Sequence, residues 1–335
     1  FSIRSFVAAT VLTMSPRCST LGPVLTLAAL SPFIAEVLFG ATPASNLGAI
    51  VPVTLVYSGA VLLIRELSLI RGSSGADRWL RVVLLGTAHA LVEEGLCLRS
   101  VFDPDVFNAS IIGGRALGVN WLWTQWTCGY HVVWSACVPI ALVEMLHSSR
   151  AAERWLSNCC LAVPLLMYAT GNCAIGYAFR AILRPEFALE WWQLGSATAV
   201  IVGLVALALV LSVTAPPAPL NAKSAKQPSP LKLGASAMVV GFCWFAQLNL
   251  PHAIRPFPLV LIPMVINALL VAALVRFLAR AAANSAARLS QAQRLAVVIG
   301  CVVINTLFGF VYVTAKVPLD RAVQGSLSLL TLVVL

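Results

Sequence analysis

Charged side chains are scarce in this sequence. Asp, Glu, Lys and Arg make up 10% of the 335 residues, whereas soluble proteins carry about 25%. This shortage of polar surface excludes a water-soluble globular protein. The nine cysteines form no CxxC pair, which argues against a disulfide scaffold. The chain also contains no GxSxG, HExxH or phosphate-loop motif, so the common serine hydrolases and zincins are excluded.

Apolar residues, by contrast, are abundant: they make up 60% of the chain, and the mean hydropathy is +0.91. A bilayer core is about 30 Å thick, so a helix that crosses it needs roughly 20 apolar residues. About ten such windows occur, the last of them short, and they predict an all-α, polytopic transmembrane helix bundle. The windows are residues 21–40, 47–66, 79–98, 119–147, 155–178, 191–213, 233–250, 256–278, 294–316 and 322–335.

Basic residues predict the orientation of these spans. With the N-terminus inside, the inner segments hold 15 Lys and Arg residues and the outer segments hold 7. The positive-inside rule therefore places the N-terminus in the cytoplasm, and we expect a plasma (inner) membrane. The net charge of +10 comes from residues that stand singly between apolar windows. We therefore expect a lipid bilayer as partner and no nucleic acid.

A proline-rich stretch at 214–232 divides the chain. Its five prolines among Ala, Ser and Lys predict an extended cytoplasmic linker rather than a span. Residues 1–213 are predicted to form a six-span bundle and residues 233–335 a four-span apolar bundle. Because the chain opens on Phe1 and stops in an apolar run, we expect that it has been shortened at one or both ends.

The third window contains three ionisable residues, His89, Glu93 and Glu94. An ionisable group at membrane depth costs roughly 2.5 to 3.5 kcal/mol, so it needs a partner, a water-filled cavity or a function. His89 and Glu93 are four residues apart and share one face of a helix. Two adjacent carboxylates in a medium of low dielectric constant cannot both stay charged at little cost. One of them is therefore expected to hold a proton, as a general acid or base must.

Other windows contain polar residues at a matching depth. His131 lies near the middle of the fourth window, while Glu36 and Asn172 fall in the outer halves of the first and fifth. In the predicted orientation Glu93 and Glu94 also lie in the outer half. Equal depth allows these side chains to meet, although it does not establish contact.

Simpler interpretations exist for the same residues. His89 and Glu93 alone would form an intrahelical pair, and Glu94 would extend toward Arg99. His131 would make a hydrogen bond between helices. Arg65, Glu66, Glu144 and His147, at the inner ends of spans, are predicted to have structural roles, with Glu144 and His147 in contact with solvent.

The Glu93-Glu94 pair, with Arg99 shortly after it and His131 in the next span, resembles the CPBP (ABI) membrane peptidases. That family includes type II CAAX prenyl endopeptidases and bacteriocin-processing proteins, and its pattern is EExxxR, FxxxH and HxxxN or HxxxD. In this chain Arg99 comes one residue late and Thr127 replaces the Phe. The nearest third motif ends at Asn172 and lacks its His. The resemblance covers about 80 residues.

This resemblance implies hydrolysis of a peptide bond at the membrane. Glu93 or Glu94 would activate a water molecule, and His131 with Asn172 would stabilise the oxyanion. The substrate would be a membrane-associated peptide or a lipid-linked molecule, and no cofactor would be needed.

A divalent metal such as zinc is a second possibility, independent of that resemblance. His89, Glu93 and His131 offer two imidazoles and a carboxylate with room for a water molecule. The metal-free version is preferred here because the chain contains no tight ligand motif.

Two other classes of function fit the same residues. In a proton- or cation-coupled transporter, Glu36, Glu93, Glu94 and His131 would form a relay. No inverted repeat is recognisable, which argues against this class. In a non-catalytic membrane scaffold subunit the buried charges would only pair with one another.

Overall fold

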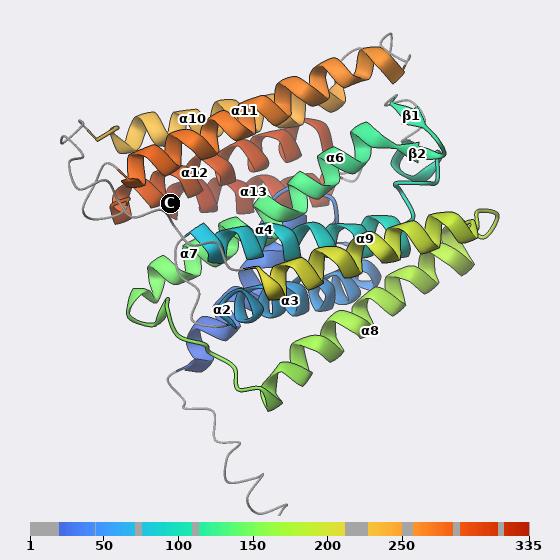
Figure 1. The fold of residues 1–335 in the computed structure, drawn as a ribbon, viewed down its shortest axis with the longest axis horizontal. Helices are drawn as coiled ribbons and strands as arrows, with labels where there is room; N and C mark the ends of the chain where they lie inside the picture. The colour runs from blue at the N-terminus through green and yellow to red at the C-terminus, as the bar shows by residue number, and fades with distance from the viewer. Residues whose placement is uncertain are drawn as a thin grey trace, which may run out of the picture.

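The computed structural model of the chain is a bundle of helices (Figure 1). It describes residues 20–43, 45–70, 76–108, 114–211, 227–249, 257–283, 289–313 and 318–334. The α-helices are α2 (Leu21–Pro32), α3 (Leu47–Ser68), α4 (Ala76–Ala90), α6 (Trp121–Tyr130), α7 (Val138–Leu146), α8 (Ala162–Ala178), α9 (Trp191–Val210), α10 (Pro230–Ala246), α11 (Phe257–Ala283), α12 (Gln291–Phe308) and α13 (Pro318–Val334).

Several helices contain a π-helical segment, in which the backbone hydrogen bonds join residues five apart. These segments are η2 (Phe33–Val37), η4 (Leu91–Cys97), η6 (His131–Cys137), η9 (Phe179–Leu183) and η11 (Gly309–Val313). Short 3₁₀ turns occur at η5 (Val106–Asn108), η7 (Ser148–Arg150), η8 (Cys159–Leu161) and η10 (Gln247–Asn249). Two short antiparallel strands, β1 (Arg115–Ala116) and β2 (Val119–Asn120), complete the described elements.

Helical structure is found in each of the ten predicted windows. Six of the described helical stretches are both long enough and apolar enough to cross a membrane, and two more are apolar but shorter. This confirms the all-α class and agrees with an integral membrane protein. The predicted number of about ten spans stays a prediction.

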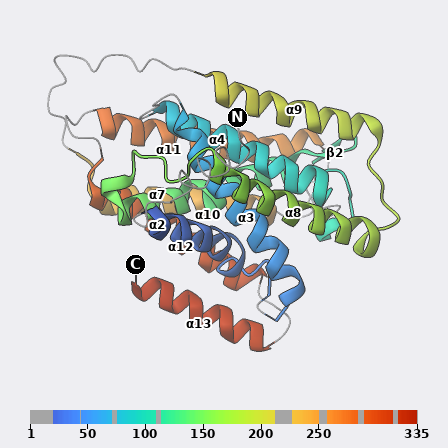
Figure 2. The ribbon, with the colours of Figure 1, turned by 90° about the horizontal axis from the view of Figure 1, so that it is seen from below.

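The helices form layers (Figures 1 and 2). Helices α10 to α13 lie on one side, while α2, α3, α8 and α9 lie on the other. The continuous segment α6–η6–α7 runs between them, and it contacts α11 and α12 on one side and α2, α3 and α4 on the other. The helices that follow the proline-rich stretch therefore cover the helix that carries His131.

Aromatic side chains join these layers. Trp126, Tyr130 and Trp134 stack along one face of α6–η6, with ring centroids 5.3 and 5.4 Å apart. Phe245 of α10 packs on Trp134 at 4.7 Å and on Phe308 of α12 at 4.8 Å. The predicted six-span and four-span parts thus share one buried core. Their division into separate domains stays a prediction from the sequence.

The predicted linker and the N-terminal segment are only partly covered by the structure. Most of the proposed linker, at 214–226, and residues 1–19 lie outside the described residues. The predicted end of the linker is wrong by a few residues, because α10 already begins at Pro230. Proline suits the first position of a helix, and the side chain of Ser229 accepts a hydrogen bond from the backbone N–H of Lys232.

A close contact between α3 and α8 depends on two glycines. A Cβ atom on Gly59 would lie 2.6 Å from the backbone of Tyr168, and one on Gly171 would lie 2.7 Å from the carbonyl oxygen of Pro52. Any larger residue would force the helices apart. This contact holds α8, with Tyr168 and Asn172, against the middle of the bundle.

The prediction that Glu144 contacts solvent is wrong. Arg65, Glu66 and Glu144 are 0%, 1% and 6% exposed. The Arg65 guanidinium lies 2.5 Å from Glu66 and 3.2 Å from Glu144, and it stacks over Trp155 at 3.5 Å. Arg78 of α4 also pairs with Glu144. These charges are buried because they neutralise one another between helices, which fits the predicted structural role. His147 is half-buried.

Candidate functional site

The ionisable residues of the third and fourth windows meet inside the bundle. His89 lies on α4, Glu93 and Glu94 on η4, and His131 on η6, and α4 packs directly against η6. Their side chains are almost fully buried, with exposed fractions between 2% and 8%. The structure thus brings together four residues that the sequence placed at similar depth.

Wide helical turns carry three of these residues. Both η4 and η6 are π-helical, and π turns inside α-helices occur frequently at functional sites. In η4 the N–H of Leu98 donates to the carbonyl of Glu93 at 2.8 Å, five residues back. Adjacent residues on an α-helix point about 100° apart. Around η4, however, both Glu93 and Glu94 reach the same imidazole of His131.

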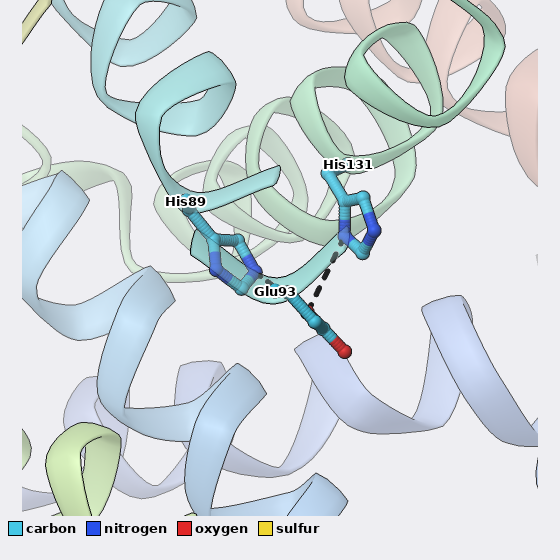
Figure 3. A group of neighbouring side chains, drawn as sticks. All are labelled: His89, Glu93 and His131. Atoms are coloured by element: carbon cyan, nitrogen blue, oxygen red, sulfur yellow. Dashed lines mark ion pairs between the residues drawn. The ribbon is translucent and has the colours of Figure 1, made fainter. Parts of the chain in front are cut away.

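Glu93 lies between the two imidazoles (Figure 3). Its Oε2 atom is 3.6 Å from Nε2 of His89 and 3.8 Å from Nδ1 of His131. Both distances exceed those of a direct hydrogen bond. Oε2 of Glu93 and Nε2 of His89 are buried, and neither has a hydrogen-bond partner in the part of the chain that the structure describes. Leaving a buried polar atom unsatisfied costs about 1 to 3 kcal/mol, so the arrangement calls for a third body between these atoms.

The other nitrogen of each imidazole faces an oxygen atom. Nδ1 of His89 lies 3.3 Å from the hydroxyl of Tyr168, and Nε2 of His131 lies 3.4 Å from Oε1 of Glu94. The Ser100 hydroxyl donates to the other oxygen of Glu94. These contacts orient both imidazole rings from the side that faces away from Glu93.

Ser135 is the one further hydroxyl found beside the inner nitrogen of His131 among the described residues. Its Oγ lies 3.3 Å from Nδ1 of His131, one turn along the same helix. This distance is at the long end for a hydrogen bond. The Ser135 hydroxyl can rotate to donate or to accept, so it does not determine whether Nδ1 of His131 carries a proton.

A third carboxylate lies next to the cluster. Glu36 of η2 accepts hydrogen bonds from Tyr57 and Thr42, both at 2.6 Å. The Tyr57 ring packs against both imidazoles, with centroids 5.7 Å from His89 and 5.8 Å from His131. Glu36 therefore approaches the imidazoles by way of Tyr57, as its depth allowed.

Asn172 occupies a neighbouring position. Its side-chain N–H donates to the carbonyl of Tyr168 at 2.8 Å, and its oxygen accepts from the thiol of Cys97 at 3.2 Å. Tyr168 in turn contacts His89. Asn172 is thus one residue removed from the imidazoles, and its predicted role as an oxyanion donor stays a prediction.

The simpler interpretation of Glu94 does not hold. Arg99 has a positive φ of 61° and donates to the carbonyl oxygens of Phe179, Phe187 and Arg184 instead of reaching Glu94. The intrahelical pair of His89 and Glu93 is likewise incomplete, because His131 approaches the same oxygen. The interhelical contact expected of His131 is present, and it is made with carboxylates.

The side chains of the cluster are almost fully buried among the described residues. A surface hollow lies beside Thr42 and therefore near Glu36 rather than near Glu93. It is lined by Val37, Gly40, Thr42, Pro43, Asp320, Val323 and Gln324. Any large substrate would need a movement of helices to reach the imidazoles, as in enzymes that open a lid.

Four residues of the site were not selected from the sequence: Tyr57, Ser100, Ser135 and Tyr168. Tyrosine and serine carry no charge, so they cost little inside a span and give no signal of their own. Only spacing offered a hint, because Tyr168 is four residues before Asn172 and so shares its helix face.

Comparison with known proteins gives no further information about this site. No family model, no curated protein and no solved structure matches the chain.

Proposed function

We propose that this protein is a membrane-embedded hydrolase whose water-activating site is the cluster of His89, Glu93, Glu94 and His131. The observation that carries the proposal is the free oxygen of Glu93. Oε2 is buried, finds no hydrogen-bond donor among the described residues, and lies within 4 Å of both imidazoles. A lone acceptor among basic groups is what the deprotonation of a bound water molecule requires.

The reaction is the hydrolysis of an acyl bond. Glu93 takes a proton from a water molecule while the oxygen of that water attacks the carbonyl carbon of the substrate. The proton is then passed to the leaving nitrogen as the C–N bond breaks. The new carboxylic acid gives up its proton to the amine, so the products are a carboxylate and a protonated amine. Glu94, fixed by Ser100, holds His131 beside the charge that develops on the carbonyl oxygen. Asn172 is proposed as a further donor.

The position of the cluster suggests the substrate class. His131 lies within a helical stretch that is long and apolar enough to cross a membrane, so a membrane-associated peptide or a lipid-linked molecule suits the site better than a soluble one. The resemblance to the CPBP membrane peptidases supports the same choice, because Glu93, Glu94 and His131 match its motifs. We also propose the plasma (inner) membrane, with the N-terminus in the cytoplasm.

The test measures whether oxygen from water is incorporated into newly formed peptide C-termini. Membranes that contain the full chain are incubated in H₂¹⁸O, and peptides with a newly formed C-terminal carboxylate are identified by mass spectrometry. We expect ¹⁸O-labelled termini that depend on the protein. Glu93→Gln should slow their formation by about 10²- to 10⁴-fold. Glu153→Gln, the same change at an exposed position, should have no effect. Labelled termini that are equally abundant with Glu93→Gln would contradict the proposal.

The third carboxylate favours a second candidate, a proton-coupled transporter. Hydrolysis does not need Glu36, yet this side chain is hydrogen-bonded to Tyr57 beside the imidazoles. A transporter would lose pH-driven uptake into vesicles with Glu36→Gln and with Glu94→Gln alike. The hydrolase would instead keep much of its activity with Glu36→Gln. A non-catalytic scaffold subunit would lose only folding or assembly.

A further inference from the structure

Three atoms of the cluster are spaced as ligands of one ion. A tetrahedral zinc ion has bonds of about 2.0 to 2.2 Å to nitrogen and oxygen, which places its ligand atoms about 3.3 to 3.6 Å apart. Oε2 of Glu93 is 3.6 Å from Nε2 of His89 and 3.8 Å from Nδ1 of His131. One atom from each residue can be chosen so that all three lie within 4.8 Å of one another. The two separations that involve Glu93 are too long for hydrogen bonds and close to those around a shared ion.

The charges around these atoms favour a cation. Glu93 and Glu94 both lie beside His131, and Glu36 approaches through Tyr57. The ion pairs found among the described residues bring no Lys or Arg side chain to Glu93 or Glu94. Histidine binds a metal in its neutral form, and a divalent cation would then balance the negative charge of the carboxylates around it.

The outer contacts prepare both imidazoles for a metal. A histidine that binds a metal through one nitrogen usually donates its other N–H to a carboxylate or another oxygen. The outer nitrogen of His131 faces the Glu94 carboxylate, and that of His89 faces the Tyr168 hydroxyl. With protons on these outer nitrogens, the lone pairs of both rings point toward Glu93.

We infer that His89, Glu93 and His131 bind a divalent transition-metal ion, and we assign it as zinc because of this ligand set. Two imidazoles and one carboxylate leave a fourth position for water, as in catalytic zinc sites. In its catalytic use the inference rests on the proposed function and changes two roles in it. The ion would bind and acidify the water, so Glu93 becomes a ligand rather than the proton acceptor, and His131 becomes a ligand rather than a donor to the oxyanion. Binding of the ion itself rests only on the geometry.

The metal content of the purified protein tests the inference. The full chain is purified in detergent with an affinity tag that contains no histidine, and its metals are measured by mass spectrometry. We expect about one zinc ion per chain. His89→Ala, Glu93→Gln and His131→Ala should each reduce this by at least tenfold. His147→Ala should leave it unchanged, because His147 lies outside the cluster.

Cobalt provides a second measurement, which detects a new spectroscopic signal rather than a loss of bound metal. Co²⁺ at a site with few ligands gives visible absorption, and a thiolate ligand adds a charge-transfer band in the near ultraviolet. We expect His89→Cys to retain Co²⁺ and to acquire that band. A histidine with a structural role only would not produce it, even if its replacement destabilised the fold.

The results separate this inference from the proposed hydrolase. Folded wild-type protein that holds neither zinc nor added Co²⁺ would overturn the metal site, whether or not peptides are cleaved. Iron at the same stoichiometry would overturn the assignment of zinc. Protein that contains zinc, loses it with His131→Ala and cleaves no peptide would support the metal site while contradicting the hydrolase.

Discussion

Nε2 of His131 lies 3.4 Å from Oε1 of Glu94, while Nδ1 of the same ring lies 3.8 Å from Oε2 of Glu93. Two carboxylates that are adjacent in sequence therefore approach different nitrogens of one imidazole. Of the two carboxylates, Glu93 is the one that also lies beside His89 among the described residues. In the proposed hydrolase, this difference would place Glu93 at the reacting centre and would leave Glu94 to orient His131.

Ser100→Ala tests the role of Glu94. The Ser100 hydroxyl donates to the Glu94 carboxylate and accepts from the indole N–H of Trp123 at 2.9 Å. Without it, Glu94 would hold His131 less firmly, and we expect hydrolysis to slow by about 10- to 100-fold. The metal ligands are untouched, so the zinc content should stay within a factor of about two of wild type. Ser196→Ala, on α9, is the control. Equal rates for both variants would contradict the role of Ser100.

Tyr168→Phe tests the partner of His89. The variant removes the oxygen 3.3 Å from Nδ1 of His89 and changes little else in shape. Loss of such an outer contact weakens metal binding by about 10- to 100-fold. Competition with a chelator of known affinity measures this change. Tyr177→Phe, on the same helix but 68% exposed, should bind metal as the wild type does.

The glycine contact between α3 and α8 yields a prediction about stability. A Cβ at position 171 would lie 2.7 Å from the carbonyl oxygen of Pro52 and 2.8 Å from the N atom of Val56. We expect Gly171→Ala to destabilise the protein by about 1 to 3 kcal/mol. Gly195→Ala, on α9, meets no atom within 4 Å and should leave stability unchanged or slightly higher. Thermal unfolding in detergent compares the two variants.

The buried ion pairs at the ends of α3 and α7 yield a second prediction about stability. Replacing Arg65 by Met leaves Glu66 and Glu144 without their shared cation, and breaking such a buried pair costs about 3 to 5 kcal/mol. Arg154→Met is the matched control, because Arg154 also approaches Glu66, at 3.5 Å, but its side chain is 36% exposed. We expect the control to cost about 0 to 1 kcal/mol. Similar unfolding temperatures for the two variants would contradict this assignment.

The loop after η4 should respond to acid. Burial alone would raise the pKa of Asp103, but hydrogen bonds from Arg184 and from the backbone of Asp105 hold it below its usual value. A carboxylate with a lowered pKa contributes stability above the unfolded pKa of about 3.9, and this contribution is lost as the pH falls through the lower, folded pKa. Unfolding temperatures measured across this range should fall more steeply for wild type and for Glu153→Gln than for Asp103→Asn.

The sequence was sufficient to predict the helices. All the apolar windows except the last are long, and helices are the natural way to satisfy the backbone inside a bilayer. The boundary at Pro230 was missed by a few residues because a Ser-Pro pair is typical of both a linker and a helix start. Glu144 was misplaced for another reason: position near the end of a span does not reveal that Arg65 and Arg78 come from neighbouring helices to neutralise it.

The site was only partly predictable. The spacing of His89 and Glu93 fixes a shared helix face, and the cost of charge in lipid selects Glu94 and His131. The π-helical turns that direct both carboxylates to His131 leave no clear trace in the sequence. Nor do Tyr168 and Ser100, whose contributions arise when distant helices pack together.

In the stack of Trp126, Tyr130 and Trp134, the middle ring lies beside the imidazole of His131: the centroids of Tyr130 and His131 are 5.9 Å apart. The protein therefore carries its own fluorophores next to the cluster. A coloured ion bound by His131 will absorb the energy of the excited indoles, so the intrinsic emission will dim as the ion enters, without any added label.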